Sequence, residues 1–377
     1  MRRPAFLRRP DVLRRHPHTE TLVVLAFLGG LAGGAVIALG LYNVSAAVPH
    51  LPPTRWALHT TYENAVRLRA PAEHEVPPDL LTDARAELGA RHFDAACRQC
   101  HAAPGELQQA TVRRMRPEPP HVTEAVEGWE PRHLHWILDQ GVKMSGMPSW
   151  PADRPEEVWS TVGFLERVRD MDAAGYARLT VPPEAVPAGP HAATLGYCAG
   201  CHGLDGMGRL RPHVPRLDIL GEEYVALALA SYRDGERESG YMRHAASEPT
   251  PAALDAVARY FGSLPAGEAG PEPDPELAER GRVLAEEGTL DDPACTACHG
   301  PPMPARAAFP NLSGQWEGYL ATQLRLWRDG DRGGTHWSEL MHKAATELSD
   351  EEIAALAAYF ASLPPSVPGD TAAAVRP

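Results

Sequence analysis

Cysteine, basic charge and long apolar runs are all scarce in this chain of 377 residues. It has only six cysteines, and its 36 Lys and Arg are outnumbered by 49 Asp and Glu, which gives a net charge of −13. Because a phosphate backbone requires a basic surface, this deficit argues against a nucleic-acid partner. The apolar content of 44% and charged content of 23% exclude wholesale disorder, collagen and a polytopic membrane protein. Sustained strand alternation is also missing, so we expect an all-α fold.

The single long apolar run extends from Thr21 to Tyr42 without a charged residue. As a helix it would be about 33 Å long and would cross the ~30 Å hydrocarbon core of a bilayer. Six arginines and only two acidic residues precede it, so the positive-inside rule predicts a cytoplasmic N-terminus and an exported body. A cleaved signal peptide is the alternative, although its apolar region is usually only about 7–15 residues long. We therefore expect a single-pass protein of the bacterial inner membrane, with its globular part in the periplasm.

All six cysteines belong to three copies of one pentapeptide, Cys-x-x-Cys-His, and none is left over. The first cysteines of successive copies are 101 and 97 residues apart, the size of a small domain. Self-similarity at a fixed period predicts tandem domains, each with the same kind of site. The motif residues are Cys97, Cys100 and His101, then Cys198, Cys201 and His202, then Cys295, Cys298 and His299.

The histidine after each cysteine pair indicates a c-type haem attachment site. Two sulfurs at this spacing reach the two vinyl groups of one porphyrin, and the adjacent imidazole turns toward the iron. A zinc site would need further cysteines or histidines paired within each repeat, and no other cysteine exists. A redox dithiol would expect a βαβ context, and disulfides would not explain three adjacent histidines. The sequence therefore predicts three covalently bound haem c groups and no catalytic residue.

A second axial ligand is expected for each haem iron, and methionine is common in electron-transfer sites. Met147 lies 50 residues after the first cysteine of repeat one, before a proline that fixes a loop, and is preferred to Met144. Met341 lies 46 residues after the first cysteine of repeat three. Met242 lies 44 residues after that of repeat two, with His244 as its rival. Two other methionines, Met207 and Met303, are too close to their attachment motifs.

Repeat two differs from repeat three just before its candidate ligand. The interval from Arg237 to Met242 is four residues shorter than the interval from Arg332 to Met341, so the two connections cannot have the same conformation. The two arginines themselves are candidates to pair with haem propionates, or else to form solvated salt bridges. The axial histidines are expected to donate their other ring N–H to carbonyls of Pro215, Pro310 and either Pro119 or Pro120.

The repeats and the composition predict seven segments. Proline clusters mark a tether and linkers, and short amphipathic helices ended by proline close the repeats, the third after an N-terminal capping signal at Ser349. The predicted segments are a basic cytoplasmic segment (1–20), a transmembrane anchor (21–42), a proline-rich tether (43–79), domain 1 (80–172), domain 2 (185–266), domain 3 (275–365) and a disordered tail (366–377).

These motifs resemble class I cytochrome c, with three domains in tandem over residues 80–365. Repeats two and three are similar to the two halves of periplasmic diheme cytochromes: both have Cys-x-x-Cys-His, Pro-x-Leu, a helix ending in Arg-Asp-Gly, a methionine and an Ala-x-Tyr-Phe-x-Ser-Leu helix. Repeat one resembles single-haem domains marked by Gly-Val-Lys-Met-Ser-Gly-Met-Pro-Ser-Trp. Repeat two has only a short helix before its motif, so packing of its first helix on its last is in doubt.

These features predict a membrane-tethered triheme electron carrier rather than an enzyme. We expect it to connect a respiratory quinol-oxidising complex or dehydrogenase with a terminal oxidase, through redox proteins that dock on its acidic surface. No nucleic acid and no small-molecule substrate is expected. One alternative is the cytochrome subunit of a membrane-bound dehydrogenase. A haem peroxidase is a further alternative, and it would require an open sixth site, for which repeat two is the candidate.

Overall fold

A computed structural model describes residues 17–181, 185–210, 212–288, 293–299, 309–335 and 337–367. Regular secondary structure in these ranges is entirely helical, and they contain no strand, so the predicted all-α class is confirmed. Residues 1–58 and 59–377 form two separate compact units. The six N-terminal arginines and residues 368–377 of the predicted tail lie outside the described residues.

The N-terminal helix α2 (Pro17–Ala38) is long and apolar enough, from His18 onward, to cross a membrane. It ends four residues before the predicted boundary at Tyr42. Gly40 has a φ of +63°, and the amide of Leu41 donates to the carbonyl of Val36 at 3.0 Å. This is the pattern of a glycine-closed helix end, which the absence of charge could not reveal.

A second helix, α3 (Pro52–Arg69), occupies much of the segment predicted as an irregular tether. Its two prolines are its first residues, where a missing N–H costs nothing, and the next proline is Pro71. The C-terminal part of α3 packs on domain 1: Val66 is buried, and the Arg67 guanidinium lies 5.6 Å from the centre of the Trp129 ring. Part of the predicted tether is therefore helical, because prolines at a helix start are compatible with the helix that follows.

Domain 1 is built around the crossing of helices α4 (Asp83–His92) and α8 (Pro155–Val168). A Cβ at Gly89 of α4 would overlap the backbone carbonyl of Ser160 in α8, so only glycine allows this approach. A later helix adds Tyr176 to the same core, beyond the predicted boundary at residue 172. The helices are α4 (Asp83–His92), α5 (Arg98–His101), α6 (Val122–Ala125), α7 (Pro131–Gln140), α8 (Pro155–Val168) and α9 (Ala173–Thr180).

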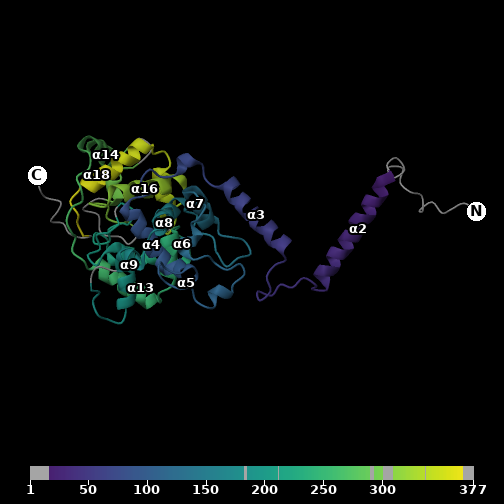
Figure 1. The fold of residues 1–377 in the computed structure, drawn as a ribbon. Coiled ribbons are helices and arrows are strands. Elements are labelled where there is room, and N and C mark those ends of the chain that lie inside the picture. The colour runs from purple at the N-terminus through teal and green to yellow at the C-terminus, as the bar shows by residue number, and fades with distance from the viewer. Residues whose placement is uncertain are drawn as a thin grey trace, which may run out of the picture. The chain divides into compact units, whose positions relative to one another are not determined.

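Domains 2 and 3 repeat one pattern of helices, and Figure 1 shows α14, α16 and α18 of domain 3 side by side. The helices of domain 2 are α10 (Ala192–His202), α11 (Glu222–Asp234), α12 (Gly240–Ser247) and α13 (Pro251–Gly262). Those of domain 3 are α14 (Pro275–Glu287), α15 (Thr296–His299), α16 (Glu317–Asp329), α17 (Ser338–Ala345) and α18 (Asp350–Ser362).

Local sequence signals account for the ends of several of these helices. Gly235 and Gly330, with φ of +80° and +82°, end α11 and α16 in the Arg-Asp-Gly motifs. The capping signal at Ser349 is confirmed, because its hydroxyl accepts from the Glu352 amide while that carboxylate accepts from the Ser349 amide. The first helix of domain 2, α10, packs differently from the first helix of domain 3. Gly196 of α10 faces the Val186 side chain, whereas Gly281 of α14 faces the backbone of the last helix, α18.

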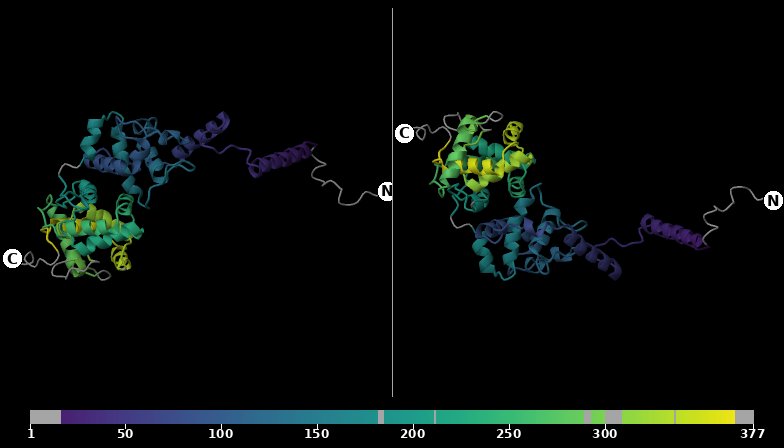
Figure 2. Two further views of the ribbon diagram at one scale, coloured as in Figure 1. Left: turned by 90° about the horizontal axis from the view of Figure 1, so that it is seen from below. Right: turned by 90° about the horizontal axis from the view of Figure 1, so that it is seen from above.

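The haem-motif domains also pack on one another within residues 59–377. Leu88 of domain 1 forms a buried cluster with Leu210 and Val214 of domain 2, against Cys201 and Tyr241. Both views of Figure 2 show the blue helices of domain 1 adjoining teal and green helices of domain 2.

The contact between domains 2 and 3 contains a fully buried ion pair. Arg216 and Asp218 of domain 2 form this pair beside Gln315 and Trp316 of domain 3. Buried contacts therefore join domain 1 to domain 2 and domain 2 to domain 3.

Candidate functional site: three histidine centres

Each attachment motif ends a helix, and its histidine is the last helical residue. In domain 1 the helix α5 follows a π-helical turn (Phe93–Cys97). The residues after the first two histidines, Ala102 and Gly203, have φ of +51° and +75° and turn the chain away. His202 and His299 are 8% and 9% exposed, so their imidazoles point into the protein.

The three histidines share one hydrogen bond that fixes the ring. The Nδ1 atoms of His101, His202 and His299 lie 2.8, 3.1 and 3.0 Å from the carbonyl oxygens of Pro120, Pro215 and Pro310. A carbonyl only accepts, so Nδ1 carries the proton and Nε2 presents its lone pair. The predicted proline carbonyls are confirmed, with Pro120 used in domain 1.

Burial keeps these imidazoles neutral, as an iron ligand must be. It lowers the pKa of His202 to about 4 and lowers the pKa of His101 and His299 as well, against the opposing effect of the proline carbonyls. Burial also raises the pKa of the Cys198 thiol to about 12, with the neighbouring Cys201 adding to the rise. Such a thiol is protonated at neutral pH, which is unlike the low-pKa thiolate of a redox dithiol.

In domain 3 the two predicted axial ligands meet directly. The Nε2 atom of His299 lies 3.4 Å from Sδ of Met341, which is carried by α17. Both side chains line a small enclosed space of about 100 Å³ together with Cys295 and Phe309. The sequence offset of 46 residues thus corresponds to two donors that face one another.

In domain 2 the predicted ligands His202 and Met242 line one large cavity of about 840 Å³, together with both cysteines. This volume lies within the roughly 300–1,000 Å³ of ligand and cofactor pockets. Met242 packs against the apolar cluster that contains Cys198, whereas the rival His244 faces the ring of His92, 5.7 Å away between centroids. Of the two candidates, Met242 is the one that faces the cavity.

Two of the candidate methionines, Met242 and Met341, are carried by helices. Met242 is in the first turn of α12 and Met341 is the fourth residue of α17. Met147 of domain 1 does lie in a loop, where its amide donates to the Ser145 hydroxyl at 3.1 Å. Its competitor Met144 is 94% exposed. Among the described residues no hydrogen bond or ring contact joins His101 to Met147.

Two arginines between domains 2 and 3, the buried Arg237 and the half-buried Arg332, suit a dianionic group. Arg237 and Arg332 both donate to the Tyr224 hydroxyl, at 3.5 and 3.3 Å, and Arg237 also donates to Tyr319 and Gln323. Neither arginine has a carboxylate partner among the described residues, and Nε of Arg332 is buried without a hydrogen-bond partner. The solvated salt bridges considered from the sequence are therefore not what these residues form.

The donor set of each centre fits a covalently bound haem. The cysteines would hold it, and the oriented histidine and a methionine would bind its iron. Between domains 2 and 3, Arg237 and Arg332 would compensate propionates. When bound, the haem iron supplies reversible one-electron oxidation and reduction. The protein itself would orient Nε2 of each histidine toward the iron, exclude water through the apolar clusters and neutralise haem propionates between domains 2 and 3.

Sequence reasoning missed an aromatic cluster between domains 1 and 2. His92 is buried between Trp150 and Tyr241, with ring centroids 4.8 Å from each, and beside His244. Local sequence signals offer no clue to it, since the four rings come from two separate helices, α4 and α12, and a loop. Burial, reinforced by His244, lowers the pKa of His92 to about 3.

Stability should therefore depend on pH through His92. The unfolded chain binds this proton below its ordinary pKa of about 6.5, while the folded protein excludes it down to about 3. The stabilising contribution is present above pH 6.5 and falls by about 1.4 kcal/mol per pH unit as pH decreases through this window. In denaturant unfolding at pH 7, 5.5 and 4.5, His92→Phe should flatten the slope, and parallel profiles for the two proteins would contradict this.

The parts of the chain that carry these centres are similar to known proteins. Residues 84–165 match the family model described as cytochrome c oxidase, cbb3-type, subunit III, and residues 278–364 match the cytochrome c model. The thiosulfate dehydrogenase electron acceptor of Thiomonas intermedia is 35% identical over 204 residues, which is 53% of this chain and 92% of that protein. Cytochrome c4 of Pseudomonas aeruginosa is 34% identical over 177 residues, covering 45% and 86% of the two chains.

A solved structure gives a partial match as well. Reduced recombinant cytochrome c4 from Pseudomonas stutzeri is 34% identical, covers 47% of this chain and 100% of its own, and has a TM-score of 0.42. The helical fold and the cysteine–histidine centres define a c-type haem protein that transfers electrons. The chain belongs to the class I cytochrome c family, with diheme-like domains and covalent haem c.

Proposed function

We propose that this protein is a membrane-anchored triheme carrier that accepts electrons from a periplasmic dehydrogenase or quinol-oxidising complex and delivers them to a terminal oxidase. The observation that carries the proposal is the threefold repetition of one centre, in which an attachment motif ends in a histidine bonded to a proline carbonyl. In this proposal residues 80–172, 185–266 and 275–365 each hold one haem, with the addition of α9 to the first.

The proposed axial pairs are His101 with Met147, His202 with Met242 and His299 with Met341. With protein ligands on both sides, each iron can change oxidation state with little rearrangement, which suits a carrier. The helix α2 supports an anchor in the inner membrane, with the acidic body on the periplasmic side. The donor side is supported by the relatives named as electron acceptors of thiosulfate dehydrogenase, and the acceptor side by the oxidase-subunit model matched in domain 1.

Haem counting tests this proposal. The purified full-length chain should contain three haems per polypeptide, and Cys198→Ala with Cys201→Ala should contain two, because that haem loses both thioethers. Absorbance during a redox titration gives the number and spin state of the haems. A high-spin haem that binds cyanide in the untreated protein would contradict the carrier and favour the peroxidase alternative.

The subunit alternative is favoured by the same named relatives, and purification separates it from the free carrier. The carrier predicts that the detergent-solubilised protein is isolated alone and is reduced by added dehydrogenase. Copurification with a catalytic subunit in constant ratio would instead make it the cytochrome subunit of a dehydrogenase complex. Deleting residues 1–42 while supplying a cleavable export signal should release the protein from the membrane fraction.

A further inference from the structure

The helix that carries Met242 begins in an unusual way. The shortened connection after Arg237 leads almost at once into α12, and Ser239 is its N-cap residue. The Ser239 hydroxyl accepts a hydrogen bond from the Met242 amide at 3.3 Å. This hydroxyl satisfies one amide only. The N-terminus of a helix leaves several amides without partners inside the helix, so further acceptors are needed at the start of α12.

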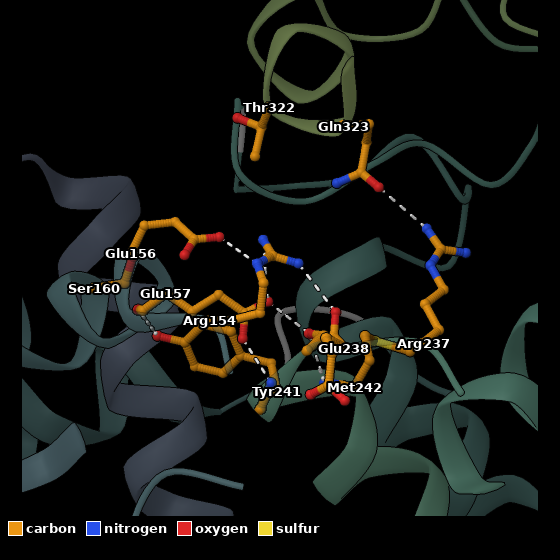
Figure 3. A network of polar contacts seen from close by, with 12 residues as sticks. Arg154, Glu156, Glu157, Ser160, Arg237, Glu238, Tyr241, Met242, Thr322 and Gln323 are labelled. Atoms are coloured by element: carbon orange, nitrogen blue, oxygen red, sulfur yellow. Dashed lines mark hydrogen bonds and ion pairs between the residues drawn. The ribbon is translucent and has the colours of Figure 1, made fainter. Parts of the chain in front are cut away.

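The remaining partners come from domain 1. Glu157 lies in the first turn of α8. One of its carboxylate oxygens accepts a hydrogen bond from the Ser239 hydroxyl and the other accepts one from the Gly240 amide, both at 2.6 Å. Two hydrogen bonds therefore connect the carboxylate of domain 1 with the backbone of Met242 in domain 2 (Figure 3). The Glu157 side chain is only 12% exposed, and a carboxylate at a helix N-terminus is favourably placed.

Other contacts hold the two helices in this arrangement. The Tyr241 hydroxyl donates to the backbone carbonyl of Glu157 at 2.9 Å, and Arg154 donates to the carbonyl of Glu238 at 3.0 Å. A Cβ at Gly240 would overlap the indole of Trp150, so the domains approach closely at this point. The start of α12 is thus enclosed by domain 1 on several sides.

The equivalent helix of domain 3, α17, follows a connection with hydrogen bonds of its own. There the Thr335 amide donates to the Ser338 hydroxyl at 3.0 Å, and the Trp337 amide donates to the Thr335 hydroxyl at 3.1 Å. These residues belong to the stretch that is four residues longer in repeat three. The start of α12 thus takes acceptors from domain 1, whereas the two hydrogen bonds described before α17 lie within the connection of domain 3.

We propose that Glu157 of domain 1 is a positioning residue for Met242 of domain 2, so that docking of domain 1 controls the axial ligation of the second haem. The inference rests on the proposed role of Met242 as a ligand. Without Glu157 the first turn of α12 loses two hydrogen bonds, and the methionine sulfur is held less firmly. A weaker methionine ligand lowers the reduction potential of the haem that it binds.

The test compares Glu157→Ala and Glu157→Gln with Glu166→Gln in the full-length holoprotein. The ferric sulfur-to-iron charge-transfer band and the potentials of the individual haems are measured. Glu157→Ala should remove up to about a third of the band, one haem of three, and lower one potential only. Glu157→Gln, which keeps one acceptor oxygen, should lie between Glu157→Ala and the wild type. Glu166 is on the same helix, nine residues after Glu157, and pairs with Arg169, so its replacement should leave both readouts unchanged.

Two further variants separate the possible failures. Ser239→Ala breaks the same chain from within domain 2 and should reproduce the spectral change, even if Glu157→Ala does not fold. Met242→Ala reports on the proposed ligand itself. If Met242→Ala loses the band of one haem while Glu157→Gln and Ser239→Ala retain it, the positioning role is wrong and the carrier stands. If Met242→Ala keeps the full band, the proposed ligation is wrong.

Discussion

Replacing Asp218 with alanine is expected to destabilise residues 59–377 by about 3–5 kcal/mol, because it leaves a buried guanidinium without its counter-charge. Arg216 is completely buried and Asp218 is 1% exposed. The Arg216 side chain donates to both carboxylate oxygens of Asp218 and to the carbonyls of Glu268 and Gly314. The carbonyls remain in the variant, but they carry no compensating charge. Denaturant unfolding followed by circular dichroism measures the loss.

An exposed ion pair provides the matched control. Glu279 pairs with Arg282 on the surface of α14, where solvent screens the two charges and the pair contributes little to stability. Glu279→Ala removes the same charge and should have little effect on unfolding. Equal effects of the two substitutions would contradict the importance of burial at Asp218.

A double replacement tests the physical reason. Arg216→Met combined with Asp218→Leu removes both charges and fills the space with apolar atoms. It should recover much of the stability lost in Asp218→Ala, since an apolar pair avoids the desolvation of two charges. The amide and carbonyl of Arg216 still bond the Gln315 side chain, so the contact between domains 2 and 3 retains its backbone hydrogen bonds.

Features with a local chemical signal could be predicted from the sequence. The attachment motifs, the helices Pro131–Gln140 and Pro275–Glu287, and the capping box at Ser349 depend on residues close together in the chain. The proline carbonyls that orient His202 and His299 lie only 13 and 11 residues downstream. Short-range regularities of this kind remain visible because the same few residues provide both the pattern and the contact.

Contacts between domains carry no such signal. Nothing near Glu157 indicates that its carboxylate bonds Ser239, 82 residues away, and nothing near Arg216 indicates burial against domain 3. In the sequence both are ordinary charged residues of a loop-rich chain. The helix α9 was not predicted, for a similar reason. Its eight residues join the core through the ring of Tyr176, which packs on Phe93 and Phe164. Their role depends on surfaces that exist only after each domain has folded.

A valine at Gly281 is expected to unfold domain 3, with a loss of about 3 kcal/mol or more, the upper part of the range for overpacked cores. A Cβ at this position of α14 would overlap the backbone carbonyl of Ala355 in α18 and approach the Cβ of Tyr359. A backbone carbonyl within a helix cannot move aside as a flexible side chain can. The two helices would have to separate, which would also break the hydrogen bond between the Tyr359 hydroxyl and Glu286.

The matched control is Arg280→Val, one position earlier on the exposed face of α14, which introduces the same β-branched side chain without the overlap. It should cost only about 0.5 kcal/mol in helix propensity. Gly281→Val should additionally lower the yield of haem bound in domain 3, because α18 contributes Leu356 and Phe360 to the wall of the space that holds His299 and Met341. Thermal unfolding and the haem-to-protein ratio measure the two effects. If both valine variants keep the stability and haem content of the wild type, close packing of α14 on α18 is not what maintains this domain.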